Sequence, residues 1–292
     1  MTAHHDLAAP LIRRGRGPMT LFGAAITPVD GGSRGTMTSG PWMTGPDGSP
    51  NSAALGVLID DTLGRATSAH RPDGLWPVTT ELSVDYTAPP PCNGQTIRSE
   101  CSVVSAQPTG VLVSGTVRDD ADRTLALATL RSRFTTTVPR DLQELFAPDA
   151  TTAPTTAALP EPRRESEPPY RESLLAMLDA SLEVDGDTAS LRVPGREILT
   201  NASGVMHGGI ALCATQLAAS HWLRPEDGMS LASVRISYLR ALEITGETRF
   251  VARVVHGGRS FRLIEVVSHG PSGKPGTVAM VAGYSGPTSA SV

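Results

Sequence analysis

A polar, glycine-containing segment followed by small apolar residues is the stretch of this chain best suited to chemistry. It runs from Asn201 to Gly209 and continues as the apolar residues 210–219. This order predicts a loop leading into a buried helix, whose first N–H groups have no partner within the helix and whose dipole is positive at that end. Gly208 and Gly209 would let a ligand oxygen approach those donors. A carbonyl group held there would be polarised.

The motif Asn-x-x-Gly-x-x-His-Gly-Gly ending at Gly209, with its helix of small residues, resembles the hotdog-fold acyl-CoA thioesterases of the phenylacetate-type group. In that family a carboxylate stands seven residues after the second glycine. This chain has Gln216 at that position. A carboxamide acts neither as a base nor as a nucleophile. Taken alone, the helix entrance therefore offers a site for an oxyanion but lacks the acid.

An internal repeat supplies a second helix of the same kind. A shift of 155 residues toward the N-terminus reaches another small-residue apolar stretch, residues 52–64. A shift of 152 residues aligns the alternating segment 234–238 with residues 82–86, so that a tyrosine ends both. Because such landmarks recur in the same order, the chain is interpreted as a tandem duplication.

Each copy is predicted to hold a short strand pair, one central helix and four longer strands with period-2 alternation. The longer strands are expected at residues 79–86, 96–105, 110–118 and 125–134, and again at 232–238, 247–256, 263–268 and 278–284. An amphipathic helix, residues 172–179, is expected before the second copy. The resemblance implies an α+β tandem double hotdog, in which each repeat is an antiparallel sheet wrapped around its central helix.

Four segments follow from this organisation. Residues 1–18 are expected to be an N-terminal tail, 19–137 the first hotdog repeat, 138–169 a linker rich in Pro, Ala and Thr, and 170–286 the second hotdog repeat. A linker of this kind is what the fusion of two hotdog protomers requires.

The carboxylate missing from the second copy is present in the first, where Asp61 aligns with Gln216. An acid eight residues into a helix lies about 12 Å from that helix's own N-terminus, whereas a base must come within about 3 Å of its target. In hotdog dimers the two central helices pack antiparallel. By this resemblance Asp61 faces His207 and Gly208, and the reciprocal pocket, with Gln216 opposite Ser52, has lost its acid and its His-Gly-Gly.

The resemblance also implies roles. The Gly208 N–H, with Gly209 beside it, would polarise a thioester carbonyl and stabilise the oxyanion. Asp61 would attack the carbonyl carbon or activate a water molecule. Asn201 would orient the carbonyl or the water, and His207 would shape the loop or donate a hydrogen bond.

Simpler interpretations stand beside these. Asp60 neighbours Asp61, and one of the two could be solvated, with the motif position favouring Asp61. The two glycines could serve only a tight turn. Gln216 could be structural, or could hold water beside an Asp, as in a related group of tandem hotdog thioesterases.

A hairpin in the second copy is a further candidate for substrate binding. Gly258, Arg259 and Ser260 join two expected strands and resemble the Gly-Arg-Ser hairpin of the family. In the family, groups near this hairpin meet the pantetheine or phosphates of coenzyme A. The resemblance therefore places these three residues in substrate binding.

Composition narrows the function classes. The 292-residue chain is 39% hydrophobic and 18% charged, with a net charge of −4, which is typical of a globular protein and disfavours nucleic-acid binding. Neither an apolar run of about 18 residues nor a signal peptide is evident, so a cytoplasmic protein without a membrane span is expected. The three cysteines form no C-x-x-C, Cys213 is expected in the core, and neither a metal nor a cofactor is expected.

The sequence therefore predicts a hydrolase that cleaves an acyl-CoA, or an acyl-carrier-protein, thioester at one composite site. A silent acyl-CoA-binding module is one alternative. A hotdog hydratase or dehydratase is another, but it would need a histidine five residues after Asp61, where Ala66 stands. A homodimer of two such chains is left open, and so is the acyl group.

Overall fold

Twelve antiparallel strands form one continuous sheet in the part of the chain that the structure describes. The structure is a computed structural model and describes residues 17–45, 47–136, 173–223 and 228–285. The strand order is β1-β2-β4-β5-β6-β3-β9-β12-β11-β10-β8-β7. The second half of this order mirrors the first. Two copies of one six-stranded unit therefore meet side by side, as a tandem duplication predicts.

The bounds of the elements follow the repeat. The first copy contains α2 (Pro18–Leu21), β1 (Ala24–Val29), β2 (Gly32–Thr38), the 3-10 turn η1 (Ser52–Leu55), α3 (Gly56–Ser68), β3 (Trp76–Tyr86), β4 (Thr96–Gln107), β5 (Gly110–Arg118) and β6 (Thr124–Thr135). The second contains α5 (Leu174–Leu178), β7 (Ser181–Asp185), β8 (Thr188–Pro194), η2 (Glu197–Leu199), α6 (Gly208–Ala219), η3 (Ser220–Trp222), β9 (Met229–Tyr238), β10 (Glu247–Gly257), β11 (Phe261–His269) and β12 (Pro275–Ser285).

Strands β3 and β9 join the two copies at the centre of the sheet. They pair antiparallel, with Leu82 opposite Ile236 and Val84 opposite Val234, and all four side chains are buried. Apolar residues at every second position place one face of each strand against the helices. Both the β3–β9 junction and the core beneath it are thus made by the same alternating residues.

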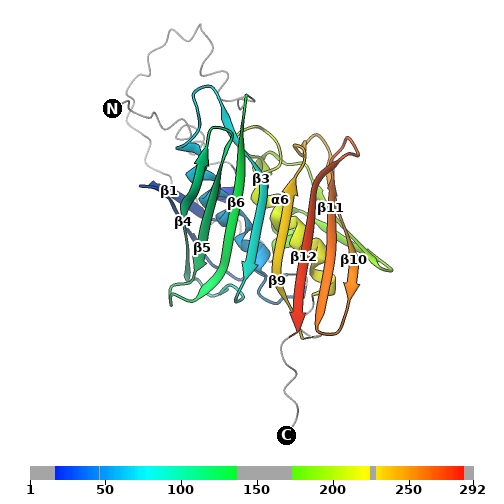
Figure 1. Cartoon of the computed structure of the whole chain (residues 1–292). Helices are drawn as coiled ribbons and strands as arrows, with labels where there is room; N and C mark the ends of the chain where they lie inside the picture. Colours follow the sequence, from blue (N-terminus) through cyan, green and yellow to red (C-terminus); the bar gives the residue numbers. More distant parts are fainter. Residues whose placement is uncertain (1–16, 46, 137–172, 224–227, 286–292) are drawn as a thin grey trace.

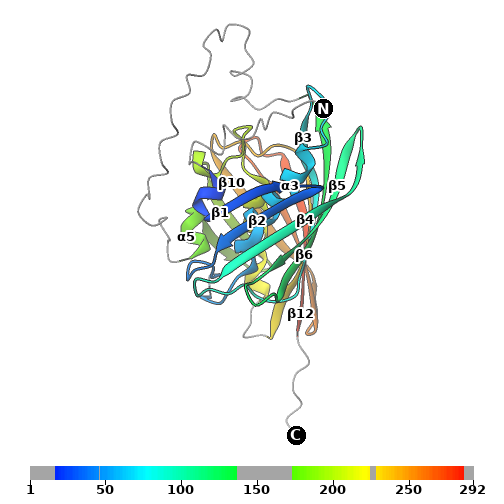
Figure 2. The same cartoon turned by 90° about the vertical axis from the view of Figure 1, so that its left-hand side faces the viewer.

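The two central helices lie side by side on the concave face of the sheet, with β1 and β2 folded over α3 on the outer side (Figures 1 and 2). Their backbones approach closely because glycines face each other. A Cβ atom on Gly56 would lie 2.6 Å from the carbonyl oxygen of Gly209, and one on Gly209 would lie 2.6 Å from that of Gly56. Any larger residue would force the helices apart.

The predicted elements are confirmed, with ends that differ by a few residues. The first helix begins with the 3-10 turn at Ser52 and extends to Ser68, four residues beyond the expected end. The helix expected at 172–179 is α5, which Ser173 caps at its start by accepting a hydrogen bond from the Ala176 N–H. Pro18 already belongs to α2 and is buried, so the expected N-terminal tail extends too far. The linker at 138–169 lies outside the described residues.

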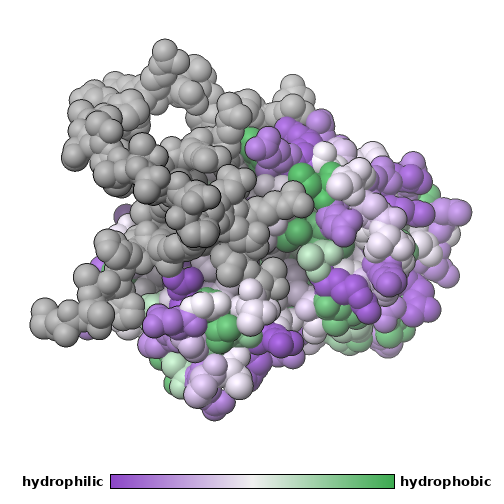
Figure 3. Space-filling view, turned by 90° about the horizontal axis from the view of Figure 1, so that it is seen from above, coloured by the Kyte–Doolittle hydropathy of each residue, from purple (hydrophilic) through white to green (hydrophobic). Residues whose placement is uncertain are grey.

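The described surface in Figure 3 is largely hydrophilic, with small hydrophobic patches between the polar residues. The large hydrophobic side chains that are exposed include Val104 on β4, Leu127 on β6 and Val255 on β10. None of the helices within the described ranges has the length and apolar character needed to cross a bilayer.

Candidate active site

The site predicted from the repeat is assembled between the two helices. His207 caps the N-terminus of α6, and its Nε2 lies 3.0 Å from the Asp61 Oδ1 on α3. The other carboxylate oxygen of Asp61 is buried and has no hydrogen-bond partner among the described residues. Because buried carboxylate oxygens are normally bonded, this oxygen is placed to take a water molecule or a substrate.

Asp60, the neighbour of Asp61, belongs to the same cluster. Its Oδ2 accepts the Gly209 N–H at 2.8 Å and lies 3.3 Å from the His207 Nδ1. The Thr79 side chain of β3 lies close to Asp60 and favours its ionised form. The alternative that one of the two aspartates is simply solvated finds no support here, because Asp60 is only 8% exposed and Asp61 is bonded to the same histidine.

Burial and charge shift the protonation of this cluster. Desolvation raises the pKa of Asp60, and the nearby Asp61 charge adds to the rise, while His207 opposes it. Burial alone would lower the pKa of His207, but the charge and hydrogen bond of Asp61, together with the charge of Asp60, raise it to about 9. His207 is therefore a cation between two acids at neutral pH. The Gly209 N lies 3.0 Å from the His207 Nδ1 and 2.8 Å from the Asp60 Oδ2. In the cationic form Nδ1 carries a proton and cannot accept, so the Gly209 N–H is then accepted by Asp60.

Within the described ranges, the Gly208 N–H is a free backbone donor at the start of α6. It has no hydrogen-bond partner among the described residues, whereas the Gly209 N–H is used by Asp60. The Gly208 carbonyl oxygen accepts the Tyr238 hydroxyl at 2.9 Å, which fixes this peptide against β9. The helix dipole favours an anionic oxygen at such a donor.

The two glycines are needed for space rather than for a tight turn. A Cβ atom on Gly208 would lie 2.7 Å from the Asp60 Oδ2, and one on Gly209 would meet the Gly56 backbone. Neither glycine has a positive φ angle. Their small size therefore admits both the carboxylate and the opposite helix.

Asn201 lies in the loop that carries His207. Its Oδ1 accepts the N–H groups of Ser203, at 2.9 Å, and Val205, at 3.4 Å. The Val205 carbonyl in turn accepts the Asn201 N–H. This carboxamide oxygen organises the turn before His207, and contact of Asn201 with substrate stays a prediction.

The Gly258–Ser260 hairpin lies at the opposite end of α6 from His207. Arg262, the second residue of β11, donates a hydrogen bond to the carbonyl of Trp222, which follows α6. From Gly208 to Trp222 the helical backbone extends about 20 Å. The hairpin, including Arg259, is thus remote from His207, because β10 and β11 turn at the C-terminal end of the helix. Contact of Gly258, Arg259 and Ser260 with substrate stays a prediction.

Gln216 lies where the repeat predicted it, opposite the start of the first helix. It and Ser52 line the same cavity, and its Nε2 donates to the Leu212 carbonyl. His207 and the two aspartates are absent from the lining of that cavity. The reciprocal pocket therefore exists as a separate space.

Sequence reasoning missed Asp60, Thr79 and Tyr238. Tyr238 carried a signal, because the repeat aligns it with Tyr86, and a tyrosine kept in both copies favours a shared task. Asp60 carried none beyond its place next to Asp61, and Thr79 could not be distinguished from Thr80.

Other chemistries find less support in the described residues. No group of three or more His, Cys, Asp or Glu side chains among them could hold a metal ion. Cys213 is buried in α6, and burial raises the pKa of its thiol, so it is a core residue as expected.

Comparison with known proteins agrees with this geometry. Residues 199–284 match the family model described as the acyl-CoA thioesterase N-terminal domain. No curated protein matches the chain by sequence.

Solved structures share the fold of nearly the whole chain. A tesB protein from Mycobacterium avium subs paratuberculosis has a TM-score of 0.59 at 10% identity, over 90% of this chain and 96% of that chain. The acyl-CoA thioesterase II TesB2 from Mycobacterium marinum has a TM-score of 0.57 at 8% identity, over 94% and 99%. A putative oleoyl thioesterase from Lactobacillus plantarum has a TM-score of 0.55 at 13% identity, over 90% and 98%.

The chain thus has the double-hotdog fold of TesB-type thioesterases, and its residues 199–284 match the acyl-CoA thioesterase domain family.

Proposed function

We propose that the protein hydrolyses an acyl-CoA thioester at one composite site, to which each repeat contributes one helix. The observation that carries the proposal is the 3.0 Å contact between the Asp61 Oδ1 and the His207 Nε2 across α3 and α6. This contact puts a carboxylate at the positive end of the opposite helix. An acid and an N–H donor at one place are what attack on a thioester carbonyl requires.

The Gly208 N–H is the proposed donor for the thioester oxygen. It is free of other hydrogen bonds among the described residues and points from the positive end of α6. As the carbonyl carbon is attacked, negative charge develops on its oxygen, and a fixed donor stabilises that charge more than the ground state.

Asp61 supplies the nucleophile in this proposal. Its free carboxylate oxygen either takes a proton from an attacking water molecule or attacks the carbonyl carbon itself, and the resulting anhydride is then hydrolysed. In both routes the C–S bond breaks and coenzyme A leaves as the thiol. His207 holds the other oxygen of Asp61, so the free one keeps its direction.

Asp60 is a positioning residue in this scheme. It bonds the Gly209 N–H and faces the His207 Nδ1, so it fixes the histidine that in turn holds Asp61. A compact cluster with a cation between two carboxylates also reduces the cost of burying the charges.

The test is release of free thiol from a panel of acyl-CoAs and acyl-carrier-protein thioesters. Wild type, Asp61→Asn and Gln216→Ala are compared with Asp187→Asn, which changes an exposed aspartate in the β7–β8 turn. We expect wild type, Gln216→Ala and Asp187→Asn to be active and Asp61→Asn to lose at least about a hundredfold in kcat.

Three results would contradict the proposal. Full activity in Asp61→Asn would exclude the composite site. Loss of activity in Gln216→Ala alone would show that the reciprocal pocket is the catalytic one. If no thioester is cleaved but acyl-CoA binds, the silent binding module is correct.

A further inference from the structure

The reciprocal pocket, here called the Gln216 pocket, is a formed cavity of about 620 Å³. This volume lies within the range of small-molecule sites. The side chains that line it include Ser52, Tyr86, Leu182, Gln216, Leu223 and Leu231. One part of its wall is therefore apolar, and another carries groups that form hydrogen bonds.

Two of its polar groups are buried and unsatisfied. Gln216 is 3% exposed and Tyr86 is 9% exposed. Their side chains lie close to each other, yet neither the Gln216 Oε1 nor the Tyr86 hydroxyl makes a hydrogen bond of regular geometry among the described residues. A buried donor or acceptor without a partner destabilises the folded protein. Both groups line the cavity, so a ligand within it could satisfy them.

The pocket lacks the groups that would cleave a thioester. The positions matching Asp60 and Asp61 are Thr215 and Gln216, and neither can act as a base. At the helix entrance Asn51 caps the Ala53 N–H with its own side chain. Among the described residues of the lining, Asp47 is the single carboxylate, and neither lysine nor arginine occurs there. A neutral chain with a carbonyl group fits this interior better than a phosphate.

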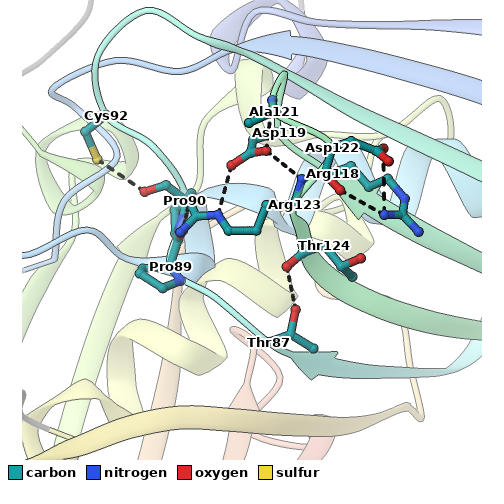
Figure 4. Close-up of polar contacts among 10 residues, drawn as sticks. All are labelled: Thr87, Pro89, Pro90, Cys92, Arg118, Asp119, Ala121, Asp122, Arg123 and Thr124. Atoms are coloured by element: carbon teal, nitrogen blue, oxygen red, sulfur yellow. Dashed lines mark hydrogen bonds and ion pairs between the residues drawn. The ribbon is translucent and has the colours of Figure 1, made fainter.

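The wall at Thr87–Pro89 is held in place by the β5–β6 hairpin (Figure 4). The Arg123 guanidinium donates to the Pro89 carbonyl, and the Thr87 hydroxyl donates to the Thr124 carbonyl at 2.6 Å. Asp119 fixes Arg123 at 2.9 Å. Desolvation opposes ionisation of Asp119, but the N–H and guanidinium of Arg123 outweigh it and lower the pKa of Asp119. The pocket is thus built before a ligand arrives.

Arg259 supplies a positive charge at the end of the molecule where the Gln216 pocket lies. The Ser260 carbonyl of the hairpin accepts the Ser285 N–H, and Ser285 pairs with Met229, which lines the pocket. Arg259 is exposed on that hairpin. A ligand whose neutral chain fills the cavity could therefore leave its anionic end outside, near a guanidinium.

We propose that the Gln216 pocket binds a second acyl-CoA molecule, with the acyl chain inside, and holds the thioester without hydrolysing it. The choice of ligand rests on the proposed function, because acyl-CoA is the substrate assigned to the His207 site. If only one pocket kept its acid after the duplication, acyl-CoA would be hydrolysed at the His207 site and only bound in the Gln216 pocket.

The experiment measures binding stoichiometry with a CoA thioether in which a methylene group separates the sulfur from the acyl carbonyl. Calorimetric titration of the full chain should give two equivalents per chain for wild type. Ser230→Trp, which places an indole at an exposed position of the lining, should give one. Ser105→Trp, on exposed β4 outside the lining, is the matched control and should give two.

A second variant, Gln216→Leu, keeps the proposal testable if Ser230→Trp does not fold. Gln216→Leu keeps the size of the side chain and removes its hydrogen bonds, so the weaker of the two Kd values should rise by about tenfold. One equivalent in wild type, or two in Ser230→Trp, would overturn the second site. These outcomes are separate from failure of the proposed function, which appears as bound thioether without hydrolysis of any thioester.

Discussion

Asp61 and His207 are 146 residues apart in the chain, and their side chains meet at 3.0 Å between two helices from different repeats. Each repeat by itself lacks half of the site. The second repeat has the helix entrance without the acid, and the first has the acid without the His-Gly-Gly. Duplication and fusion permit this division, because each copy has to keep only the half that one composite site uses.

Protonation of His207 should make stability depend on pH. The pKa of His207 is about 9 in the folded protein, above the ordinary value of 6.5. The folded state therefore binds the proton more tightly, and this stabilisation is complete below pH 6.5 and lost as the pH rises through about 9. We expect a fall of at most a few kcal/mol in the free energy of unfolding, since one pKa unit is about 1.4 kcal/mol. Urea unfolding at a series of pH values measures it.

The His207→Gln variant is the control for that measurement, because glutamine does not titrate. Its free energy of unfolding should be lower than that of wild type near pH 6 and flatter up to pH 9. An equal slope in both proteins would assign the effect to other groups.

Asp60 and Asp61 should respond differently to removal of their charges. In Asp60→Asn the new side-chain oxygen can still accept the Gly209 N–H, so we expect a loss in kcat of about tenfold or less. Asp61→Asn removes the proposed base and should lose at least about a hundredfold. The Asp60 charge is one of the causes that raise the pKa of His207, so that pKa should fall in Asp60→Asn, as followed by NMR of the imidazole. A larger loss of kcat in Asp60→Asn than in Asp61→Asn would make Asp60 the reacting acid.

The sequence predicted that Asp61 and His207 lie together because the repeat could be aligned residue by residue. The same shift that aligned Asp61 with Gln216 also aligned Ser52 with His207. Antiparallel packing of α3 and α6 then brings Asp61 to His207 and Gln216 to the side of Ser52. Asp60 could not be chosen in this way, since neighbouring positions on a helix differ by about 100° and only packing decides which face is buried. Here Gly208 and Gly209 have no side chains, and this leaves room for both acids next to α6.

The hairpin at Gly258–Ser260 shows what local sequence patterns leave open. A hairpin is recognised from local residues, but the end of the central helix that it borders depends on strand direction. Strand β10 runs toward the C-terminal end of α6, so Arg259 lies near the Gln216 pocket and not near His207. Thr79 was missed for a similar reason, because a bulge in β3 next to it sets which face it presents.

Substitution of Gly209 should mainly lower stability, whereas substitution of Gly208 should mainly lower kcat. A Cβ on Gly209 meets backbone atoms of Gly56 and Val57 at 2.6 Å, so Gly209→Ala must move a helix and should cost about 1–3 kcal/mol. Gly208→Ala displaces the Asp60 carboxylate instead, and should lower kcat more than it lowers stability. The control is Gly64→Ala, where a Cβ meets nothing within 4 Å and α3 should gain about 0.5–1 kcal/mol. Thermal unfolding with kcat for each variant distinguishes them.

Asn201 should act through the loop, and its aspartate variant tests this. Asn201→Ala removes the acceptor of the Ser203 and Val205 N–H groups, which should cost about 1 kcal/mol and loosen the turn before His207. Asn201→Asp keeps the accepting oxygen but loses the amide donor. If the oxygen in the turn is what matters, Asn201→Asp restores both stability and kcat to near wild type. If the amide donates to the thioester carbonyl, Asn201→Asp restores stability while kcat stays as low as in Asn201→Ala, and Asn201 then joins Gly208 as a group that contacts the substrate.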